Sequence, residues 1–265
     1  MKQIALDIGL DSGPSLRNFL AGPNLGALEH LVLWSGYDKR SPVPTYLWGE
    51  SGSGKSTFAR VLSGIQLPTA GYVNYMGQGI QNGKTTYEGE LRKAVQMVFQ
   101  DPYSSLNPRM RIINAVAEAV KIHQHVSKEE SIEIAGKLLE RMGISGIDAQ
   151  KYPSYLSGGQ RQRASVARAL SVQPKVLVAD EPTSAIDQSA QSQLLELFNE
   201  LIKDGLSIVL VSHDLGVIRY LADNVYVMQN GVFVENGSAS DIFQNPTNEY
   251  TRKLISSIPG HKLNS

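Results

Sequence analysis

Short apolar runs alternate with amphipathic segments along most of this chain of 265 residues. The apolar runs are bounded by polar or glycine-rich residues, which is typical of buried strands; they lie at 43–48, 94–99, 175–179 and 207–211. The amphipathic segments have the spacing of helices that cover a sheet; they lie at 56–63, 112–124, 158–170 and 188–204. Buried strands that alternate with helices predict an α/β fold with a mainly parallel sheet flanked by helices.

One stretch interrupts this alternation. Between about 101 and 155 the patterns are helical, with a capping box at Ser127–Glu130, so we expect an inserted helical subdomain there. Further along, Asn230-Gly231 joins two strand patterns and predicts a tight hairpin. A C-terminal tail begins at about 241 and looks helical in its first part.

Composition narrows the class of protein. Hydrophobic residues make up 42% of the chain, and 25 basic residues balance 25 acidic ones. A neutral chain has no bulk charge that attracts nucleic acid or a membrane surface, so neither is an expected direct partner. Cysteine is absent, no apolar run has the roughly 18 residues of a membrane span, and Asp7 interrupts a signal-peptide core. We therefore expect a cytoplasmic protein that reaches membranes only through partner subunits.

The segment Gly49–Ser56 matches the P-loop pattern G-x-x-x-x-G-K-[ST] and lies between a strand pattern and a helix pattern. Its glycines let backbone N–H groups turn toward a phosphate, and the helix N-terminus adds its dipole. We expect Lys55 to reach the outer phosphates of ATP and the Ser56 hydroxyl to ligate Mg²⁺. The alternative is an ordinary glycine-serine loop. The predicted ATP-binding residues are Gly49, Glu50, Ser51, Gly52, Ser53, Gly54, Lys55, Ser56 and Thr57.

Polar residues also follow three other predicted strands. One strand ends in Asp180-Glu181, where Asp180 fits a Mg²⁺ ligand and Glu181 fits the base that takes a proton from the attacking water. Gln100 follows another strand and is expected to touch Mg²⁺ or that water. His213 follows a third, where it would orient water and share transition-state charge. Taken singly, each has a structural alternative: a helix cap, an exposed loop glutamine or a structural histidine.

A second glycine-rich helix start lies at Leu156–Gln160. Serine and glycine at a helix N-terminus form an anion site. One bound nucleotide does not need two such sites in one chain, whereas a head-to-tail homodimer does, because each loop would close on the γ-phosphate held by the other chain. A plain N-cap with a flexible approach is an equally good interpretation of the local chemistry. The residues expected to act in trans are Ser157, Gly158, Gly159 and Gln160.

Taken together, these motifs resemble those of an ATP-binding-cassette (ABC) ATPase in order and spacing, from about Gly49 to Ser257. The resemblance implies ATP and Mg²⁺ as cofactors, with Gln100 as the Q-loop and His213 as the switch histidine. It also implies Ser184–Asp187 as a D-loop that places Asp187 at a dimer interface. Hydrolysis is expected if that dimer forms.

Two further stretches, Gln100–Arg109 and Asn245–Leu254, resemble the peptide and nickel importer branch of the family. The resemblance implies that the chain energises uptake through two membrane permease subunits. Two other functions stay open. One is a DnaA-type AAA+ regulator that binds a replication clamp, and the other is a fold chimera without turnover.

Residues 1–48 do not resemble an ABC N-terminus, which begins with antiparallel strands and an aromatic residue that stacks on adenine. Trp34 and Tyr37 lie on the wrong kind of element, so neither is given that role. Pro14–Asn24 and the amphipathic pattern after it instead resemble the DnaA-related Hda group of AAA+ ATPases. We expect a chimera, most simply an engineered one, of an Hda-like segment at 1–48 and an ABC-type core at 49–265. A divergent natural N-terminus is the alternative.

The altered start has a predicted structural consequence. The strand pattern at Gly71–Tyr75 would lack its usual partners and lie at an unpaired edge, which favours disorder or aggregation. Phosphate binding should survive because its donors are local, while adenine stacking would weaken.

Overall fold

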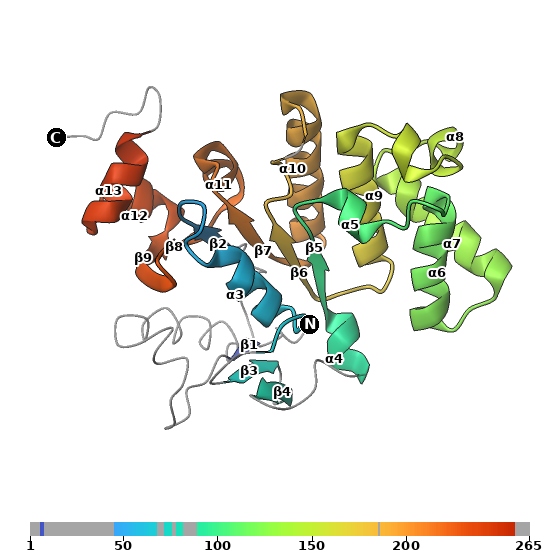
Figure 1. The fold of residues 1–265 in the computed structure, drawn as a ribbon, viewed down its shortest axis with the longest axis horizontal. Helices are drawn as coiled ribbons and strands as arrows, with labels where there is room; N and C mark the ends of the chain where they lie inside the picture. Colours follow the sequence, from blue (N-terminus) through green and yellow to red (C-terminus); the bar gives the residue numbers. More distant parts are fainter. Residues whose placement is uncertain are drawn as a thin grey trace. The chain divides into compact units, whose positions relative to one another are not determined.

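The computed structural model describes residues 6–7, 45–67, 72–75, 78–81, 89–184 and 186–257. The chain divides into two compact units, one formed by Met1–Arg92 with Ser207–Ser265 and the other by Lys93–Leu206. Figure 1 labels the elements of both. The helix expected after Asn24 and the aromatic residues Trp34 and Tyr37 lie outside the described residues.

The first unit contains strands in the order β7-β2-β8-β9. The parallel strands are β2 (Thr45–Trp48), β7 (Ser207–Ser212) and β8 (Asn224–Gln229), with β2 between the other two. β9 (Val232–Ser238) runs antiparallel beside β8, as the Asn230-Gly231 hairpin signal predicts. Every residue of β2 is buried, which agrees with its continuous apolar and aromatic pattern.

The same unit contains the helices α3 (Lys55–Leu62), α11 (Leu215–Leu221), α12 (Ala239–Gln244) and α13 (Glu249–Ser256). Of these, α3 and α12 pack on the strands through aromatic rings. Phe58 of α3 meets Phe233 edge to face, with ring centroids 5.2 Å apart, and Phe233 contacts Tyr226 at 5.6 Å. Trp48 lies 6.2 Å from Phe243 of α12. These contacts fix α3 against the C-terminal strands, and α3 is the helix that opens at the P-loop.

A small antiparallel sheet also belongs to the first unit, in the order β1-β3-β4; its strands are β1 (Leu6–Asp7), β3 (Tyr72–Tyr75) and β4 (Gln78–Gln81). Leu6 pairs with Tyr75, and Val73 pairs with Ile80. The predicted unpaired edge at 71–75 is therefore wrong, because β3 has a neighbour on each side. The short β1 carries too little pattern for the sequence to have indicated its pairing.

The second unit combines a parallel strand pair with a run of helices. The parallel strands are β5 (Val95–Val98) and β6 (Val176–Asp180), and their register places Val95 opposite Val176. The helices are α4 (Gly89–Ala94, entering from the first unit), α5 (Pro102–Ser105), α6 (Ile112–Gln124), α7 (Lys128–Arg141), α8 (Gly146–Ala149), a 3-10 turn (Pro153–Tyr155), α9 (Gly158–Leu170) and α10 (Gln188–Lys203). The helical stretch expected between 101 and 155 is thus present as α5 to α8.

Helix ends follow the sequence signals closely. Ser127 caps α7 by accepting the Glu130 N–H at 3.1 Å, which is one half of the predicted capping box. Gly64 and Gly143 follow the ends of α3 and α7 with φ of 72° and 69°, a left-handed conformation that glycine adopts without strain. Within the residues that the structure describes, no helix has both the length and the apolar character needed to cross a membrane.

Candidate functional site

The P-loop Gly49–Ser56 joins the end of β2 to the start of α3. Gly52 and Gly54 have φ of 82° and 101°, which would strain any other residue. The Ser53 N–H donates to the Glu50 carbonyl at 3.2 Å and closes the turn. Gly54 is the N-cap of α3, and no side chain caps the helix. The start of α3 is therefore suited to an anionic group such as a phosphate.

Lys55 is 4% exposed and folds back on its own loop. Its Nζ donates to the Gly49 carbonyl at 2.6 Å, to the Glu50 carbonyl at 2.8 Å and to Ser53 Oγ at 3.2 Å. These contacts hold the ammonium group against the curve of the loop. A phosphate oxygen is a stronger partner for an ammonium group than a neutral carbonyl is, so the lysine is placed to exchange some of them.

The β8–β9 hairpin supports the P-loop from the C-terminal half of the chain. The Gly231 N–H donates to the Ser53 carbonyl at 2.8 Å. A Cβ at Gly49 would lie 2.2 Å from the Met228 carbonyl oxygen, so only glycine allows this close approach. The Asn230-Gly231 turn was expected from the sequence, but its contact with the loop was not, because no local pattern encodes it.

Tyr250 of α13 is a further neighbour of the loop that sequence reasoning missed. Its hydroxyl oxygen accepts the Glu50 N–H at 3.0 Å. The surrounding segment had only suggested a family branch, and a tyrosine in an amphipathic helix gives no local sign of a contact 200 residues away.

His213 follows β7 directly and is exposed. Trp48 of β2 pairs with Ser212 of β7 in a parallel ladder. Gly49 and His213 therefore leave neighbouring strands at the same edge of the sheet. The structure brings the predicted switch histidine and the P-loop to one edge, where polar groups of open parallel sheets gather.

In the second unit, Gln100 and Glu181 lie in contact. Val98 pairs with Ala179 in the parallel pair β5–β6, so the residues that follow both strands emerge at one edge. Gln100 Nε2 donates to Glu181 Oε2 at 3.3 Å, and neighbouring Asp180 is buried at 3% exposure. Glu181 has a φ of 44°, a strained value of the kind found at functional turns.

The second glycine-rich start, at α9, is completed by its own side chains. Ser157 Oγ accepts the Gln160 N–H at 3.2 Å, and Gln160 Oε1 accepts the Ser157 N–H at 3.0 Å, which is a full capping box. Gln160 Nε2 also donates to Asp148 at 3.0 Å. The hydrogen bond from Lys151 is the main cause that holds the pKa of Asp148 below its ordinary value; desolvation opposes it, and bonds from Ser145 and Gln160 lower the pKa further.

Gly159 and the predicted D-loop residue Asp187 share a neighbour. A Cβ at Gly159 would lie 2.5 Å from the Ala190 Cβ, so glycine is required where α9 crosses the start of α10. Asp187 caps α10 by accepting the Ala190 N–H at 2.9 Å. The structure therefore brings the start of α9 and Asp187 together, although their expected roles across a dimer stay predictions.

The predicted magnesium ligands are Ser56, Gln100 and Asp180. No group of three histidine or acidic side chains in the described part of the chain is arranged to hold a metal ion alone. The hydroxyl of Ser56, the amide oxygen of Gln100 and the carboxylate of Asp180 are each a kind of oxygen donor that Mg²⁺ accepts.

A family model described as ABC transporter matches residues 44–184, which is more than half of the chain. The chain belongs to this family. Membership confirms the predicted cofactors of this ABC chain, ATP and Mg²⁺.

Curated relatives of this ABC chain are transport ATP-binding proteins. A di/tripeptide transport ATP-binding protein of Pseudomonas aeruginosa is 46% identical over 212 residues, which are 80% of this chain and 66% of the relative. Oligopeptide transport ATP-binding proteins of Lactococcus lactis and Bacillus subtilis are each 42% identical to this chain over 80% of its length. The matched regions are 67% and 71% of those two proteins. The chain thus spans about two thirds of the length of these relatives. They support the peptide part of the predicted peptide and nickel importer branch.

Solved structures agree with this ABC assignment. A dimeric ATP-binding cassette in a post-hydrolysis state, bound to ADP and Pi, superposes with a TM-score of 0.67 at 28% identity, over 77% of this chain and 88% of the other. The structure of cbiO1 from Clostridium perfringens gives 0.66 at 27% identity, over 84% and 87%. These matches confirm the predicted α/β P-loop NTPase fold with a mainly parallel sheet flanked by helices.

Proposed function

We propose that this chain binds and hydrolyses Mg-ATP as the energising subunit of a peptide importer. The observation that carries the proposal is the P-loop, with an uncapped helix start and a buried lysine folded into the loop. The similarity to di/tripeptide and oligopeptide transport ATP-binding proteins supports the peptide class of cargo.

In this proposal the residues Gly49–Thr57 bind the phosphates, with Lys55 on the outer ones. Ser56, Gln100 and Asp180 would hold the magnesium ion, which when bound neutralises charge on the phosphates. Glu181 would accept a proton from the attacking water, and its contact with Gln100 supports a shared role in placing that water. His213 would stabilise charge that develops on the γ-phosphate.

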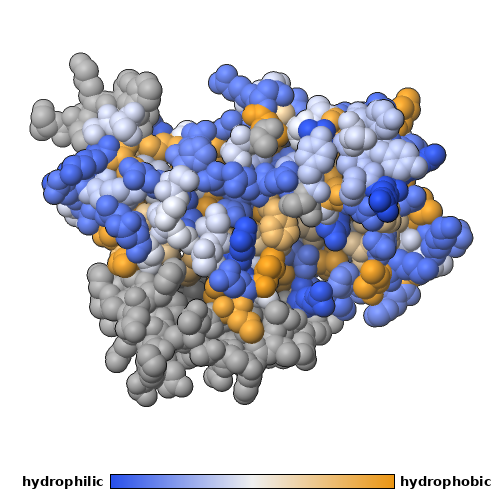
Figure 2. Space-filling model, viewed as in Figure 1, coloured by the Kyte–Doolittle hydropathy of each residue, from blue (hydrophilic) through white to orange (hydrophobic). Residues whose placement is uncertain are grey.

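Hydrolysis by this scheme requires a second copy of the chain. Ser157–Gln160 would close on the nucleotide bound by that copy, and Asp187 would lie at the interface; the dimeric state of the similar cassettes supports this arrangement. Membrane permease subunits are the further partners, with the chain on the cytoplasmic side. On the face shown in Figure 2, most of the described surface is hydrophilic. Among the described residues, the apolar side chains of Ile147 and Tyr155 in the helical run are 78% and 74% exposed, which suits contact with a partner.

For residues 1–48 we propose an Hda-like origin and a chimeric chain. The ABC family match begins at residue 44, so residues 1–43 lie outside it. Separate sequence comparisons of 1–48 and 57–265 test it, and both parts matching one natural protein would overturn it. Clamp binding by the purified chain would favour the DnaA-type alternative instead.

The test of the main proposal is Glu181→Gln in a titration with Mg-ATP, followed by phosphate release and dimerisation. We expect turnover to fall by about 10²- to 10⁴-fold while Mg-ATP binding persists and a dimer accumulates. Glu118→Gln, the same change at an exposed position of α6, is the control and should leave turnover unaltered. Binding without turnover in the unaltered chain would instead favour a fold chimera without turnover.

A further inference from the structure

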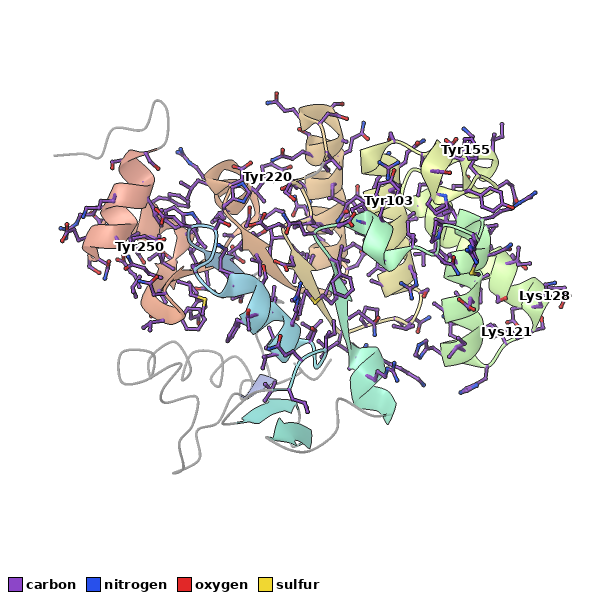
Figure 3. All side chains as sticks on the ribbon, in the orientation of Figure 1. Tyr103, Lys121, Lys128, Tyr155, Tyr220 and Tyr250 are labelled. Atoms are coloured by element: carbon purple, nitrogen blue, oxygen red, sulfur yellow. The ribbon has the colours of Figure 1, made fainter. Side chains whose placement is uncertain are left out.

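The C-terminal helix α13 contacts the P-loop through one hydrogen bond. The Glu50 N–H donates to the hydroxyl of Tyr250 at 3.0 Å, although the two residues are 200 positions apart. Burial is the main cause that raises the pKa of the Tyr250 hydroxyl, so the group remains neutral and able to accept at physiological pH. Figure 3 places Tyr250 in α13 and Tyr220, another tyrosine of the same unit, in α11.

The position of Tyr250 is itself fixed by a carboxylate on β9. Glu235 accepts the Thr247 N–H at 2.6 Å, the Thr247 hydroxyl at 2.7 Å and the Asn248 N–H at 3.2 Å. Asn248 in turn caps α13 by accepting the Tyr250 N–H at 2.8 Å. The buried side chain of Ile255 holds the other end of the helix against the unit. Tyr250 is therefore presented to the loop by a fixed helix start.

The peptide group between Gly49 and Glu50 is held on both of its polar sides. Its N–H is donated to Tyr250, and its carbonyl, that of Gly49, accepts from Lys55 Nζ at 2.6 Å. The Glu50 carbonyl, in the next peptide group, accepts from Lys55 Nζ at 2.8 Å and from the Ser53 N–H at 3.2 Å. The orientation of this peptide sets where the following residues of the loop begin their turn. A binding loop that is already ordered loses less conformational freedom when the ligand binds, which raises affinity.

We propose that Tyr250 is a positioning residue, and that its hydroxyl holds the P-loop in the conformation that binds the phosphates of a nucleotide. This inference rests on the proposed function, because it concerns the same site. It gives the C-terminal helix a part in nucleotide affinity, although α13 supplies no predicted ligand to the phosphates or to Mg²⁺.

The test is Tyr250→Phe, which removes the hydroxyl and keeps the ring. We expect the KM for Mg-ATP and the Kd for Mg-ADP to rise by about threefold to tenfold with kcat unchanged, because one hydrogen bond that orders the loop before binding is lost. Tyr220→Phe is the matched control: Tyr220 is 56% exposed, lies in the same unit and should bind as the unaltered chain does. In the nucleotide-free protein, hydrogen exchange at the Glu50 amide should speed up in Tyr250→Phe alone.

The outcomes separate the two proposals. If the unaltered chain binds no Mg-ATP or Mg-ADP, the proposed function fails and the positioning role fails with it. If the unaltered chain binds but Tyr250→Phe binds as tightly as Tyr220→Phe, only the positioning role is overturned. A loss of thermal stability in Tyr250→Phe with unchanged KM would likewise assign the hydroxyl a purely structural part.

Discussion

The two glycine-rich helix starts of this chain contain the same kinds of residue but are completed in different ways. The α9 start has a full capping box, in which Ser157 and Gln160 satisfy each other's backbone N–H groups. The α3 start has Gly54 as its N-cap and no side-chain cap. The first is held by residues of its own turn, and the second is supported by Gly231 and Tyr250 from the C-terminal half of the chain.

The difference indicates what each start is suited to do. A capping box satisfies two backbone N–H groups at the helix start and gives the helix a stable beginning without a ligand. At a start without a side-chain cap, the helix N-terminus can bind an anionic ligand. Contacts from other parts of the chain must then hold the loop in its conformation. Glycine and serine at a helix start therefore do not by themselves distinguish a phosphate site from a closed cap.

The largest effect is expected from a substitution at the α3 start. Lys55→Ala removes the ammonium group that lies against Gly49, Glu50 and Ser53, and we expect Mg-ATP affinity to fall by about 100-fold, since charge-assisted hydrogen bonds to phosphate are lost. Isothermal titration calorimetry measures this. Lys137→Ala, at an exposed lysine paired with Glu133 in α7, is the control and should bind normally.

If Lys55→Ala still bound Mg-ATP within about twofold of the unaltered chain, the lysine would contribute far less than the roughly 1.4 kcal/mol of a tenfold change in affinity. The contrast between the two starts would then be in doubt. The helix start and backbone alone would then account for phosphate binding, and the lysine would be a structural part of the loop.

The next effect concerns the packing of α9. Gly159→Ala adds a methyl group 2.5 Å from the Ala190 Cβ, so α9 and α10 must move apart, and we expect the free energy of unfolding to fall by about 1–3 kcal/mol. Urea denaturation measures this. Gly146→Ala, also at the first turn of a helix but with no atom within 4 Å of the added carbon, should be close to neutral.

A second substitution sharpens this test. Ala190→Gly removes the methyl group that the new side chain would meet, so the double variant should recover part of the lost stability. If the two changes were additive, the loss in Gly159→Ala would come from another source than this contact.

Much of the fold could be predicted from residue patterns, and the reason lies in local chemistry. Asn230 and Gly231 have φ of 50° and 79°, the left-handed pair that an Asn-Gly hairpin requires. The strand before the P-loop and the helix after it were likewise predictable from the local pattern of apolar and polar residues. What could not be predicted depends on contacts between distant segments: the pairing of β1 with β3, the support of Glu50 by Tyr250, and the contact between Gln100 and Glu181.

A smaller effect separates capping from function at α9. Ser157→Ala removes the N-cap acceptor and should lower the free energy of unfolding by about 1 kcal/mol. Ser127→Ala at the start of α7 removes a comparable cap, since Ser127 accepts the Glu130 N–H at 3.1 Å, and should cost about the same. Thermal unfolding compares the two. Only Ser157→Ala should also lower ATP turnover by the dimer. Equal turnover in both variants would mean that Ser157 acts only as a helix cap.

The smallest expected effect is a dependence on pH that only the α9 start should show. The pKa of Asp148 is lowered, mainly by the hydrogen bond from Lys151, so its ionised form stabilises the folded state above the ordinary carboxyl pKa of 3.8. That stabilisation is lost as the pH falls through the lower folded-state value, and the Gln160 side chain then loses a charged acceptor. We expect the first-turn amides of α9 to exchange faster at a pH well below 3.8 than near pH 6, after correction for intrinsic rates, and Asp148→Asn to abolish the difference. The first turn of α3 contains no acidic residue, so its amides should show no such change. An equal acid response at both starts would mean that global loosening, rather than Asp148, is the cause.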